Sequence, residues 1–455
     1  MTGRAVVRGA GLCAPAQSHN RRPESSAHST LAHGRANTQR EYMLMFRTAT
    51  SAEPLADRQL RALHPLLSPL HEALRVSDAT TIATQLRLAQ LAAPTGAESQ
   101  RAALVTDAFV RRGFSAVRMD SAGNVIARRP SQMHVHAPVV CMAHLDTVFA
   151  ADTPLVLRQE GDRFVCPGIG DNARGLGGML ALADALGVPG RDCHAVALMR
   201  PVEFVATVGE EGLGNLKGAR AYFDELERNG VVPHAVLALD GPGDERIVHH
   251  ALGSRRFRIT FNGPGGHSWA DFGRPNAVHA AGRATHWMAS LPADFRGRVA
   301  LSVGRIGGGE SLTAIPTHAW MDVDVRATDD ASLAMAERQL RALVRQSAMD
   351  ENAGRRTDML TADVQLLGER PAGYIDRDHP VVALAMAATR AIGRDPLGAV
   401  ASTDANIPLS RGIPAITIGA GGRGGGAHTA DEWFENVDGA RGLSRAMSIL
   451  VALAA

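Results

Sequence analysis

The sequence predicts an α/β fold in which a small β-α-β-β-α-β domain interrupts a larger domain with a mixed sheet. Short apolar runs alternate with helical segments up to about residue 253, which is typical of a buried sheet covered by helices. After Gly253 the pattern changes to half-buried strands and two helices, and the α/β pattern then returns.

The elements of the larger domain follow in order. Helical spacing runs from Leu55 to Leu91, with expected breaks at Pro65 and Pro69, and a further helix extends through Val110. The following segments are expected to be strands: Asn124–Ala127, Val139–Met142, Glu203–Thr207, Ala235–Leu239 and Ala415–Ile418. The following are expected to be helices: Ala173–Leu186, His379–Ile392 and Val437–Ala454.

The inserted domain is expected to have a ferredoxin-like order of elements. Its strands are Arg255–Phe261, Val299–Ile306, Ala319–Arg326 and Asp363–Leu367, and its helices are Asn276–Leu291 and Asp330–Asp350. We therefore assign residues 254–361 to the inserted domain and residues 51–253 plus 362–455 to the larger domain. Residues 1–50 lack periodicity and are expected to be a disordered extension.

Composition excludes several function classes. Apolar residues make up 45% of the 455 residues and the net charge is +2, so the chain is globular and has no electrostatic pull toward nucleic acid or anionic membranes. Lys217 is the only lysine, and no phosphate-binding loop is present. No apolar run is long enough to span a membrane, and the four cysteines show no disulfide spacing, which favours the cytoplasm.

Five short motifs carry acidic residues or histidines at strand ends. His144 and Asp146 form an H-x-D pattern whose alternation places both side chains on one side of the chain, although alone it fits a surface histidine. Asp171 follows two glycines, and the alternative role there is capping the next helix by Asp or Asn. Glu210 and Glu211 follow a strand, where the alternative is a solvated acidic turn.

Two further motifs complete the pattern. Asp240 ends an apolar run, and His428 follows a glycine run after the strand Ala415–Ile418. That run contains G-x-G-x-x-G, but it is not followed by the second strand that a dinucleotide-binding unit requires. Together the motifs supply two imidazoles and three carboxylates, a donor set that suits two zinc-type ions and predicts hydrolysis. The residues of this set are His144, Asp171, Glu211, Asp240 and His428.

The ordered motifs H-x-D, G-x-x-D-N, E-E-G, D-G and G-A-H resemble the cocatalytic zinc peptidases and amidohydrolases. This superfamily includes peptidase T, carboxypeptidase G, aminoacylase, acetylornithine deacetylase and succinyl-diaminopimelate desuccinylase. The resemblance implies that His144 and Asp240 hold one metal, that Glu211 and His428 hold the other, and that Asp171 bridges both. It also implies a cis peptide bond after Asp171.

The resemblance implies catalytic roles for three residues. Asp146 orients His144, and Glu210 is the general base that takes a proton from the bridging water and passes it to the leaving amine. The G-G-H-S segment matches a lid or dimerisation domain whose histidine, here His267, stabilises the oxyanion, often in the partner's site.

The resemblance also implies three residues on the substrate side of the site: Arg326, which ends a D-x-R segment, and Asp404 and Asn406 in the loop Ser402 to Asn406. A structural salt bridge is the alternative for Arg326, and a helix cap is the alternative for the loop that carries Asp404 and Asn406. Many relatives have Asn where this chain has Thr313, and Thr offers one hydroxyl in place of an amide.

Asp240 followed by glycine resembles the peptidase T branch, so we expect a cytoplasmic homodimer that cleaves short peptides. The expected cofactors are two divalent ions, zinc first and cobalt or manganese as alternatives. Hydrolysis of N-acyl amino acids or carboxypeptidase activity is the nearest alternative. A metal-free binding protein is a remote one, since no ligand or base is missing.

Overall fold

The computed structural model describes residues 54–131, 137–192, 194–292, 299–353 and 359–455. The predicted extension over residues 1–50 lies outside the described residues. Among the described residues, no helix is both long and apolar enough to cross a membrane.

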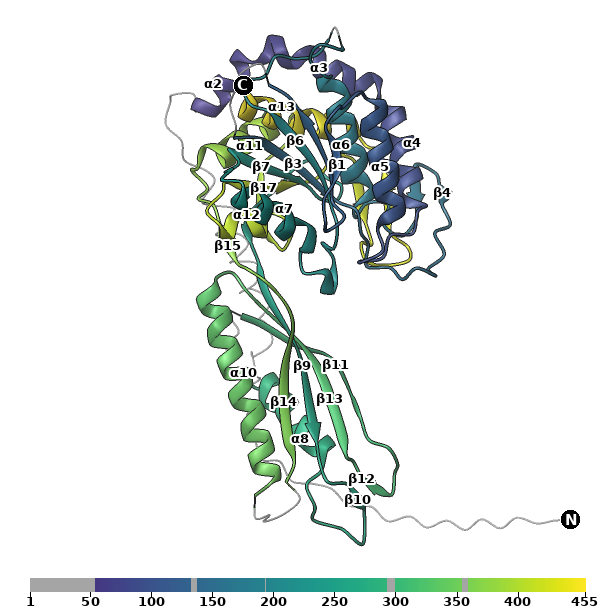
Figure 1. Cartoon of the computed structure of the whole chain (residues 1–455), viewed down its shortest axis with the longest axis vertical. Helices are drawn as coiled ribbons and strands as arrows, with labels where there is room; N and C mark the ends of the chain where they lie inside the picture. The colour runs from purple at the N-terminus through teal and green to yellow at the C-terminus, as the bar shows by residue number, and fades with distance from the viewer. Residues whose placement is uncertain (1–53, 132–136, 193, 293–298, 354–358) are drawn as a thin grey trace, which may run out of the picture. The chain divides into compact units, whose positions relative to one another are not determined.

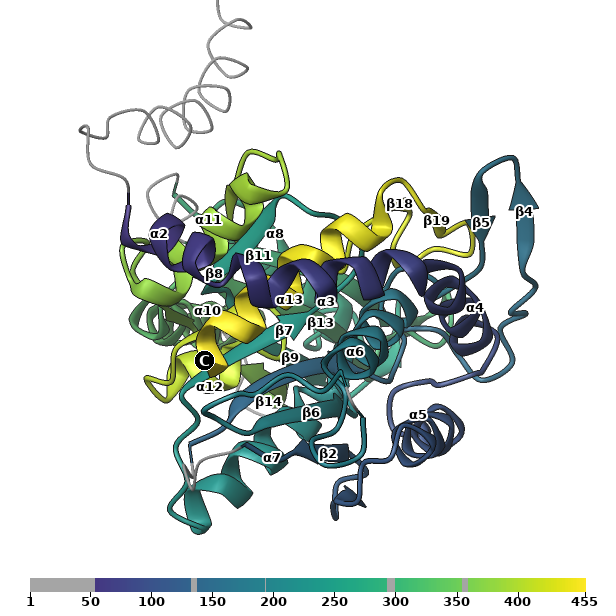
Figure 2. The ribbon, with the colours of Figure 1, turned by 90° about the horizontal axis from the view of Figure 1, so that it is seen from above.

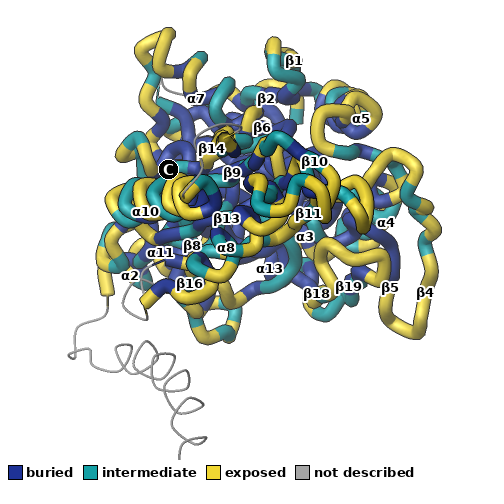
Figure 3. The backbone as a smooth tube through the Cα atoms, turned by 90° about the horizontal axis from the view of Figure 1, so that it is seen from below, coloured by how far each residue is buried: buried dark blue, intermediate teal, exposed yellow. Residues whose placement is uncertain are grey.

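The larger domain is built on a nine-stranded mixed sheet (Figure 1). Strands β3, β6, β7 and β17 run parallel to one another at its centre, and the outer pairs are antiparallel except that β16 runs parallel to β8. All residues of these four central strands are buried, and β6 is drawn dark blue in Figure 3. In sheet order the strands are β1 (Val117–Met119), β2 (Val125–Arg129), β6 (Val202–Thr207), β3 (Val139–His144), β7 (Ala235–Leu239), β17 (Ala415–Ile418), β8 (Arg246–Ala251) and β15 (Gly373–Tyr374), and β16 (Leu397–Ala401) pairs with β8.

Helices pack against this sheet and against one another. Helix α6 lies against β3 and β7, and α13 lies against α3, α6 and α11 (Figure 2). The helices of this domain are α2 (Leu55–Ala62), α3 (His64–Val76), α4 (Asp78–Ala89), α5 (Ser99–Arg111), α6 (Ala173–Leu186), α7 (Lys217–Arg228), α11 (Pro380–Ala391), α12 (Asn406–Ser410) and α13 (Gly439–Ala454). The chain therefore has the predicted α/β architecture.

One expected helix break is wrong. Pro65 occupies the first turn of α3, where its missing N–H costs nothing, but α3 continues through Pro69 to Val76. Leu67, Leu70 and Leu74 are buried on one face of this helix. Their packing holds the helix together across a residue that local propensity would place at its end.

A second, four-stranded sheet was not predicted. It consists of β4 (Arg158–Glu160), β5 (Arg163–Val165), β18 (Arg423–Gly425) and β19 (Trp433–Glu435), in the order β18-β19-β5-β4. This sheet joins the segment before Asp171 to the glycine-rich segment that carries His428. It thereby brings together two motifs that are about 250 residues apart in the sequence.

The inserted domain has the predicted ferredoxin-like arrangement. Its antiparallel sheet has the order β11-β13-β9-β14, and α8 and α10 pack with one face of the sheet in a shared core. We call this domain, residues 253–370, the lid. Its elements are β9 (Gly253–Asn262), α8 (Ala277–Ala289), β11 (Val299–Gly308), β13 (His318–Ala327), α10 (Asp330–Glu351) and β14 (Thr361–Arg370), with the short pair β10 (Gly266–His267) and β12 (Ala314–Ile315).

The lid sheet extends beyond the predicted domain boundary. The expected range 254–361 stops at the first residue of β14, whereas β14 pairs with β9 from Thr361 through Arg370. The expected boundary at 361 leaves out the strand Asp363–Leu367, which the sequence pattern itself places in the inserted domain. The strand expected over Asp363–Leu367 lies inside β14, and the pairing with β9 shows that the whole of Thr361–Arg370 belongs to the lid sheet.

Candidate metal centre

The candidate site lies at the carboxyl edge of the central parallel strands. Strands β6 and β7 both run parallel to β3, so the residues that follow all three strands meet at one edge of the sheet. His144 is the last residue of β3, Glu210 and Glu211 follow β6, and Asp240 directly follows β7. The sheet order thus brings three of the predicted motifs together.

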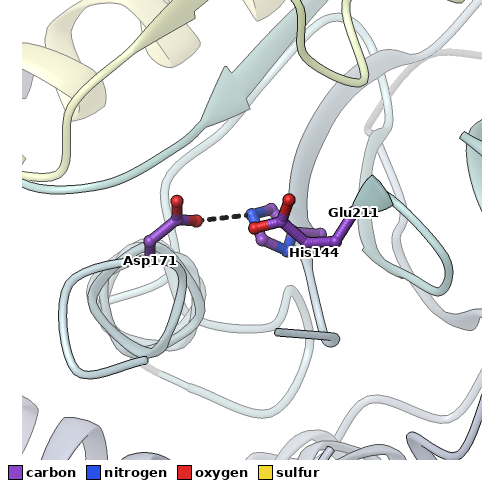
Figure 4. A group of neighbouring side chains, drawn as sticks. All are labelled: His144, Asp171 and Glu211. Carbon is purple, nitrogen blue, oxygen red and sulfur yellow. Dashed lines mark hydrogen bonds and ion pairs between the residues drawn. The ribbon is translucent and has the colours of Figure 1, made fainter. Parts of the chain in front are cut away.

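A histidine and two carboxylates form the centre of this group (Figure 4). One ligand atom each from His144, Asp171 and Glu211 lie within 4.8 Å of one another. His144 Nε2 lies 2.9 Å from Asp171 Oδ1 and 3.9 Å from Asp240 Oδ1. His428 Nε2 lies 3.3 Å from Asp171 Oδ2 and 3.2 Å from Glu211 Oε1. We refer to these five residues as the ligand cluster.

The two oxygens of Asp171 face different histidines. This is the arrangement in which a single carboxylate can be shared by two adjacent cations, one beside His144 and one beside His428. The donor atoms are nitrogen and oxygen, which fits zinc, cobalt or manganese. The residues present therefore fit a pair of divalent ions.

The electrostatics of the ligand cluster favour cations. Hydrogen bonds with Asp171 and Glu211 raise the pKa of His428 to about 10. Burial opposes the charged form of His144, but contacts with Asp146 and Asp171 outweigh it and raise the pKa of this imidazole well above its ordinary value. Burial likewise opposes ionisation of Asp171, but the two histidines hold its pKa well below the usual range. Carboxylates that hold protons on histidines this firmly can hold divalent cations in their place.

Asp146 connects β3 to the loop that follows β6. Its fully buried carboxylate accepts hydrogen bonds from the main-chain N–H of Glu210 at 2.9 Å and of Glu211 at 2.8 Å, and from the Thr95 hydroxyl at 2.8 Å. Asp146 Oδ1 also lies 3.5 Å from His144 Nδ1, opposite the ring nitrogen that faces Asp171. The Asp146 carboxylate therefore contacts both a histidine of the cluster and the main chain of the two glutamates.

The loop that presents Asp171 is fixed at the start of α6. The peptide bond between Asp171 and Asn172 is cis, as expected. The Asn172 side chain accepts a hydrogen bond from Gly175 N at 3.0 Å and donates one to Leu239 O at 2.9 Å. Asn172 is thus the N-cap of α6, which leaves the Asp171 carboxylate directed into the cluster.

Glu432 supports the same loop and was not predicted. Its buried carboxylate accepts hydrogen bonds from three main-chain N–H groups, those of Gly168 at 2.7 Å, Gly170 at 2.8 Å and Asp171 at 2.7 Å. Burial outweighs these bonds and raises the pKa of Glu432 to about 7. No sequence signal distinguishes this residue, which stands beside an exposed acidic neighbour, Asp431.

Glu210 is buried beside a buried arginine that was also not predicted. Arg370 Nη1 lies 3.0 Å from Glu210 Oε1, and its Nη2 donates to the main-chain carbonyl of Glu210. Burial is the main cause that raises the pKa of Glu210 well above its ordinary value, against the attraction of Arg370. Such a carboxyl is suited to accept and release a proton.

His267 lies on β10 of the lid and is exposed. Its Nδ1 accepts hydrogen bonds from the main-chain N–H of Trp269 at 3.2 Å and of Ala270 at 3.3 Å. The neutral ring therefore carries its proton on Nε2, which is a donor available for a ligand. Within the described residues, no hydrogen bond or ion pair joins His267 to the ligand cluster of its own chain. Thr313 lies beside it, because its carbonyl accepts from Ser268 N at 2.9 Å.

The three expected substrate-side residues lie in different settings. Arg326 is partly exposed on β13 and pairs with Asp324 through Nε at 2.6 Å. Asp404 is buried, accepts a hydrogen bond from the Thr207 hydroxyl, and lines a small cavity with His144 and Asp240. The Asn406 side-chain amide bonds with main-chain atoms: it accepts from Thr403 N and donates to Leu252 O and Pro371 O, each at 2.9 Å. These contacts give Asn406 a structural role in joining the lid ends.

The glycine-rich run has no dinucleotide-binding geometry. After β17 the chain passes through Gly421 and Gly422, both with positive φ, into the short strand β18 and then to His428. No helix opens after the glycines, so the run lacks the helix N-terminus that holds a pyrophosphate.

Two family models match successive parts of the chain. Residues 124–254 match Peptidase family M28, and residues 250–352 match the Peptidase dimerisation domain of M20. No curated protein matches the chain.

Three solved structures illustrate the likeness in fold. The aminopeptidase PepT from Bacillus cereus ATCC 10987 is 21% identical, with a TM-score of 0.65 over 82% of this chain and 98% of that one. An amidase of the hydantoinase/carbamoylase family from Burkholderia vietnamiensis is 21% identical, with a TM-score of 0.61 over 84% and 97%. YXEP from Bacillus subtilis, a dinuclear metal-binding peptidase of family M20, is 15% identical, with a TM-score of 0.60 over 83% and 98%.

The two matched segments and the ligand cluster agree with each other and with the resemblance seen in the motifs. One segment of the chain is therefore similar to Peptidase family M28 and the next to the Peptidase dimerisation domain of M20, and the ligand cluster fits the metal-dependent hydrolases that these families contain.

Proposed function

We propose that this protein is a dinuclear metal hydrolase that cleaves amide bonds of short peptides. The observation that carries the proposal is the position of Asp171, whose two oxygens face His144 and His428 at 2.9 Å and 3.3 Å. His144 and Asp240 would hold one ion, His428 and Glu211 the other, and Asp171 would be shared. When bound, the two ions, zinc in the first instance, supply an activated water and polarise the scissile carbonyl.

Glu210 is the proposed general base. It directly precedes a ligand, is buried next to the cluster, and is held by main-chain and side-chain contacts on both sides. A carboxylate in this position can accept a proton from the nucleophile and donate it to the leaving amine. His267, with its proton on Nε2, is the proposed oxyanion donor in the partner subunit's site.

Two features favour a peptide substrate of the peptidase T type. Asp240, rather than a glutamate, follows β7, and the aminopeptidase PepT shares the fold. The amidase from Burkholderia vietnamiensis shares it equally, so hydrolysis of an N-acylated amino acid is the second candidate function. Arg326 and Asp404 are proposed to contact the substrate.

The variant Glu210→Gln tests the chemistry. Loss of a general base costs typically about 100- to 10,000-fold in turnover, so kcat is expected to fall by that range while metal content stays the same. Glu227→Gln, which alters an exposed glutamate on α7, serves as the control. Peptide hydrolysis is followed with purified, zinc-loaded protein, and metal content by mass spectrometry. Unchanged turnover in Glu210→Gln would refute the assignment of the base.

One tripeptide, free and N-acetylated, tests the substrate class. Cleavage of the free form alone, with release of its N-terminal residue, would support an aminopeptidase. Release of acetate or of the C-terminal residue from the blocked form would instead support a deacylase or carboxypeptidase.

A further inference from the structure

The loop that follows β6 is held from two strands of the lid. Arg256 on β9 donates to the carbonyl of Gly212, and Arg370 at the end of β14 contacts Glu210. β9 and β14 are neighbours in the lid sheet, so both arginines come from the same end of that sheet. The loop that carries the proposed base is therefore anchored on the lid.

The approach of the lid to this loop is close. A Cβ on Gly368 of β14 would lie 2.2 Å from the amide of the Asn215 side chain, so a larger residue there would displace that side chain. Asn215 itself has a positive φ of 55°, at the end of the short 3₁₀ turn Gly212–Gly214. The lid strand β14 and the turn that follows β6 are therefore packed closely against each other at this contact.

Arg370 is the member of this contact that reaches a catalytic group. Its side chain is 5% exposed and donates from Nη1 to Glu210 Oε1 at 3.0 Å and to Ser402 Oγ at 3.2 Å. Its Nη2 donates to the carbonyl of the same glutamate. The guanidinium therefore holds both the main chain and the carboxylate of Glu210.

Stability does not account for this placement. A buried ion pair gains little over apolar packing, because desolvation of both charges offsets their attraction. Arg370 also carries a cost, since its buried Nε has no acceptor among the described residues. What the contact provides is a fixed geometry for Glu210. The two donors, Nη1 and Nη2, lie in one planar guanidinium group, so they bind the carboxylate and the carbonyl of Glu210 in a single orientation.

We propose that Arg370 is a positioning residue for the general base, which it holds in place from the last strand of the lid. This inference rests on the proposed function, in which Glu210 is the base. The same residue then both attaches the lid to the loop after β6 and orients Glu210.

The test compares Arg370→Ala and Arg370→Lys with a matched control, Arg220→Ala. Arg220 donates to the carbonyls of Glu369 and Asn215, so it supports the same junction without touching Glu210. Displacement of a catalytic group by about 1 Å can cost about 100-fold, so Arg370→Ala is expected to lower kcat roughly 10- to 100-fold. KM, metal content and the circular dichroism spectrum are expected to stay near wild type, and Arg370→Lys is expected to recover part of the loss.

A double-mutant cycle separates positioning from a general structural effect. In the Glu210→Gln background, Arg370→Ala is expected to change the residual kcat by less than about threefold, because the group it positions has already been removed. An equal loss in both backgrounds would overturn the proposal, as would loss of bound metal in Arg370→Ala. If Arg370→Ala does not fold, Arg370→Lys and Arg370→Gln carry the same cycle.

The two hypotheses fail in different ways. Unchanged turnover in Glu210→Gln means that the proposed function has the wrong base. Unchanged turnover in Arg370→Ala, beside an inactive Glu210→Gln, overturns only the role of Arg370. Arg220→Ala is expected to keep kcat within about threefold of wild type, since its bonds are to main-chain carbonyls outside the site.

Discussion

Glu432 is the residue whose side chain links the two halves of the ligand cluster. It follows His428 by four positions, and its carboxylate holds the main chain of Gly168, Gly170 and Asp171. Ligands of a metal need such outer contacts to stay in place, and their loss typically weakens metal binding about 10- to 100-fold.

Glu432→Gln is therefore expected to weaken metal affinity by roughly 10- to 100-fold. Both carboxylate oxygens of Glu432 accept from main-chain N–H groups. In glutamine an NH₂ group replaces one of these oxygens, so this NH₂ and a main-chain N–H, both donors, would face each other. The control is Asp431→Asn, which changes the neighbouring exposed carboxylate that pairs with Arg158. Competition against a chelator measures the affinity, and equal affinities for the two variants would contradict the role of Glu432.

The site at residue scale was only partly predictable. The five residues of the ligand cluster, together with Asp146 and Glu210, stand next to strands in short motifs, so the sequence indicates them as candidates. Glu432 and Arg370 act on partners 261 and 160 positions away, where the sequence gives no local signal. Their roles arise from sheet pairing, which brings β19 beside β5 and β14 beside β9.

At the scale of elements, helix α6 sets the distance between Asp171 and the end of β7. Gly175 in its first turn packs against the carbonyl of Leu239, the last residue of β7. A Cβ at this position would lie 2.6 Å from that carbonyl oxygen and 2.1 Å from Asn172 Oδ1. Helix and strand can approach each other this closely only because position 175 has no side chain.

Gly175→Ala is expected to lower the free energy of unfolding by about 1–3 kcal/mol, although alanine is the better helix former. Gly177→Ala in the same helix is the control. Its Cβ would meet Gln85 Cβ at an ordinary 3.4 Å, so the better helix propensity is expected to stabilise the protein by up to about 1 kcal/mol. Denaturant unfolding measures both, and similar effects of the two variants would contradict this account.

His71 on α3 is a pH-sensitive contact between α3 and α13. Its Nε2 lies 3.0 Å from Ser448 Oγ, and burial lowers the pKa of the imidazole below 6.5. The unfolded chain therefore binds a proton that the folded chain resists, so the stabilisation is complete above pH 6.5 and is lost as the pH falls below it. His71→Gln is expected to show a smaller loss of Tm between pH 7.5 and pH 5 than wild type. An equal loss would contradict the assignment.

The elements themselves were largely predictable, and the failures have common causes. The bounds of α6, β7 and β17 agree with the sequence pattern because apolar runs there end at glycine, proline or charged residues. Strand β8 was missed because His249 and His250 interrupt its apolar run, and β18 because it is mostly glycine. Both strands are defined by their partners rather than by their own composition.

At the scale of the whole molecule, the M20 dimerisation domain predicts a homodimer. We expect His267 to act across the dimer, since its free Nε2 donor makes no contact with the ligand cluster of its own chain within the described residues. Mixing His267→Ala chains with Glu210→Gln chains, each inactive alone, is expected to restore about a quarter of wild-type activity when subunits exchange at random. No recovery under conditions of proven exchange would contradict action across the dimer.

The lid enters and leaves the larger domain at one point, because Ser254 and Arg370 face each other on adjacent antiparallel strands. Paired residues on such strands lie only about 5 Å apart, a gap that a two-residue turn can close. The catalytic sheet thus needs nothing from the lid to keep its own chain continuous. The lid is therefore a single insertion between two neighbouring points in the chain of the larger domain.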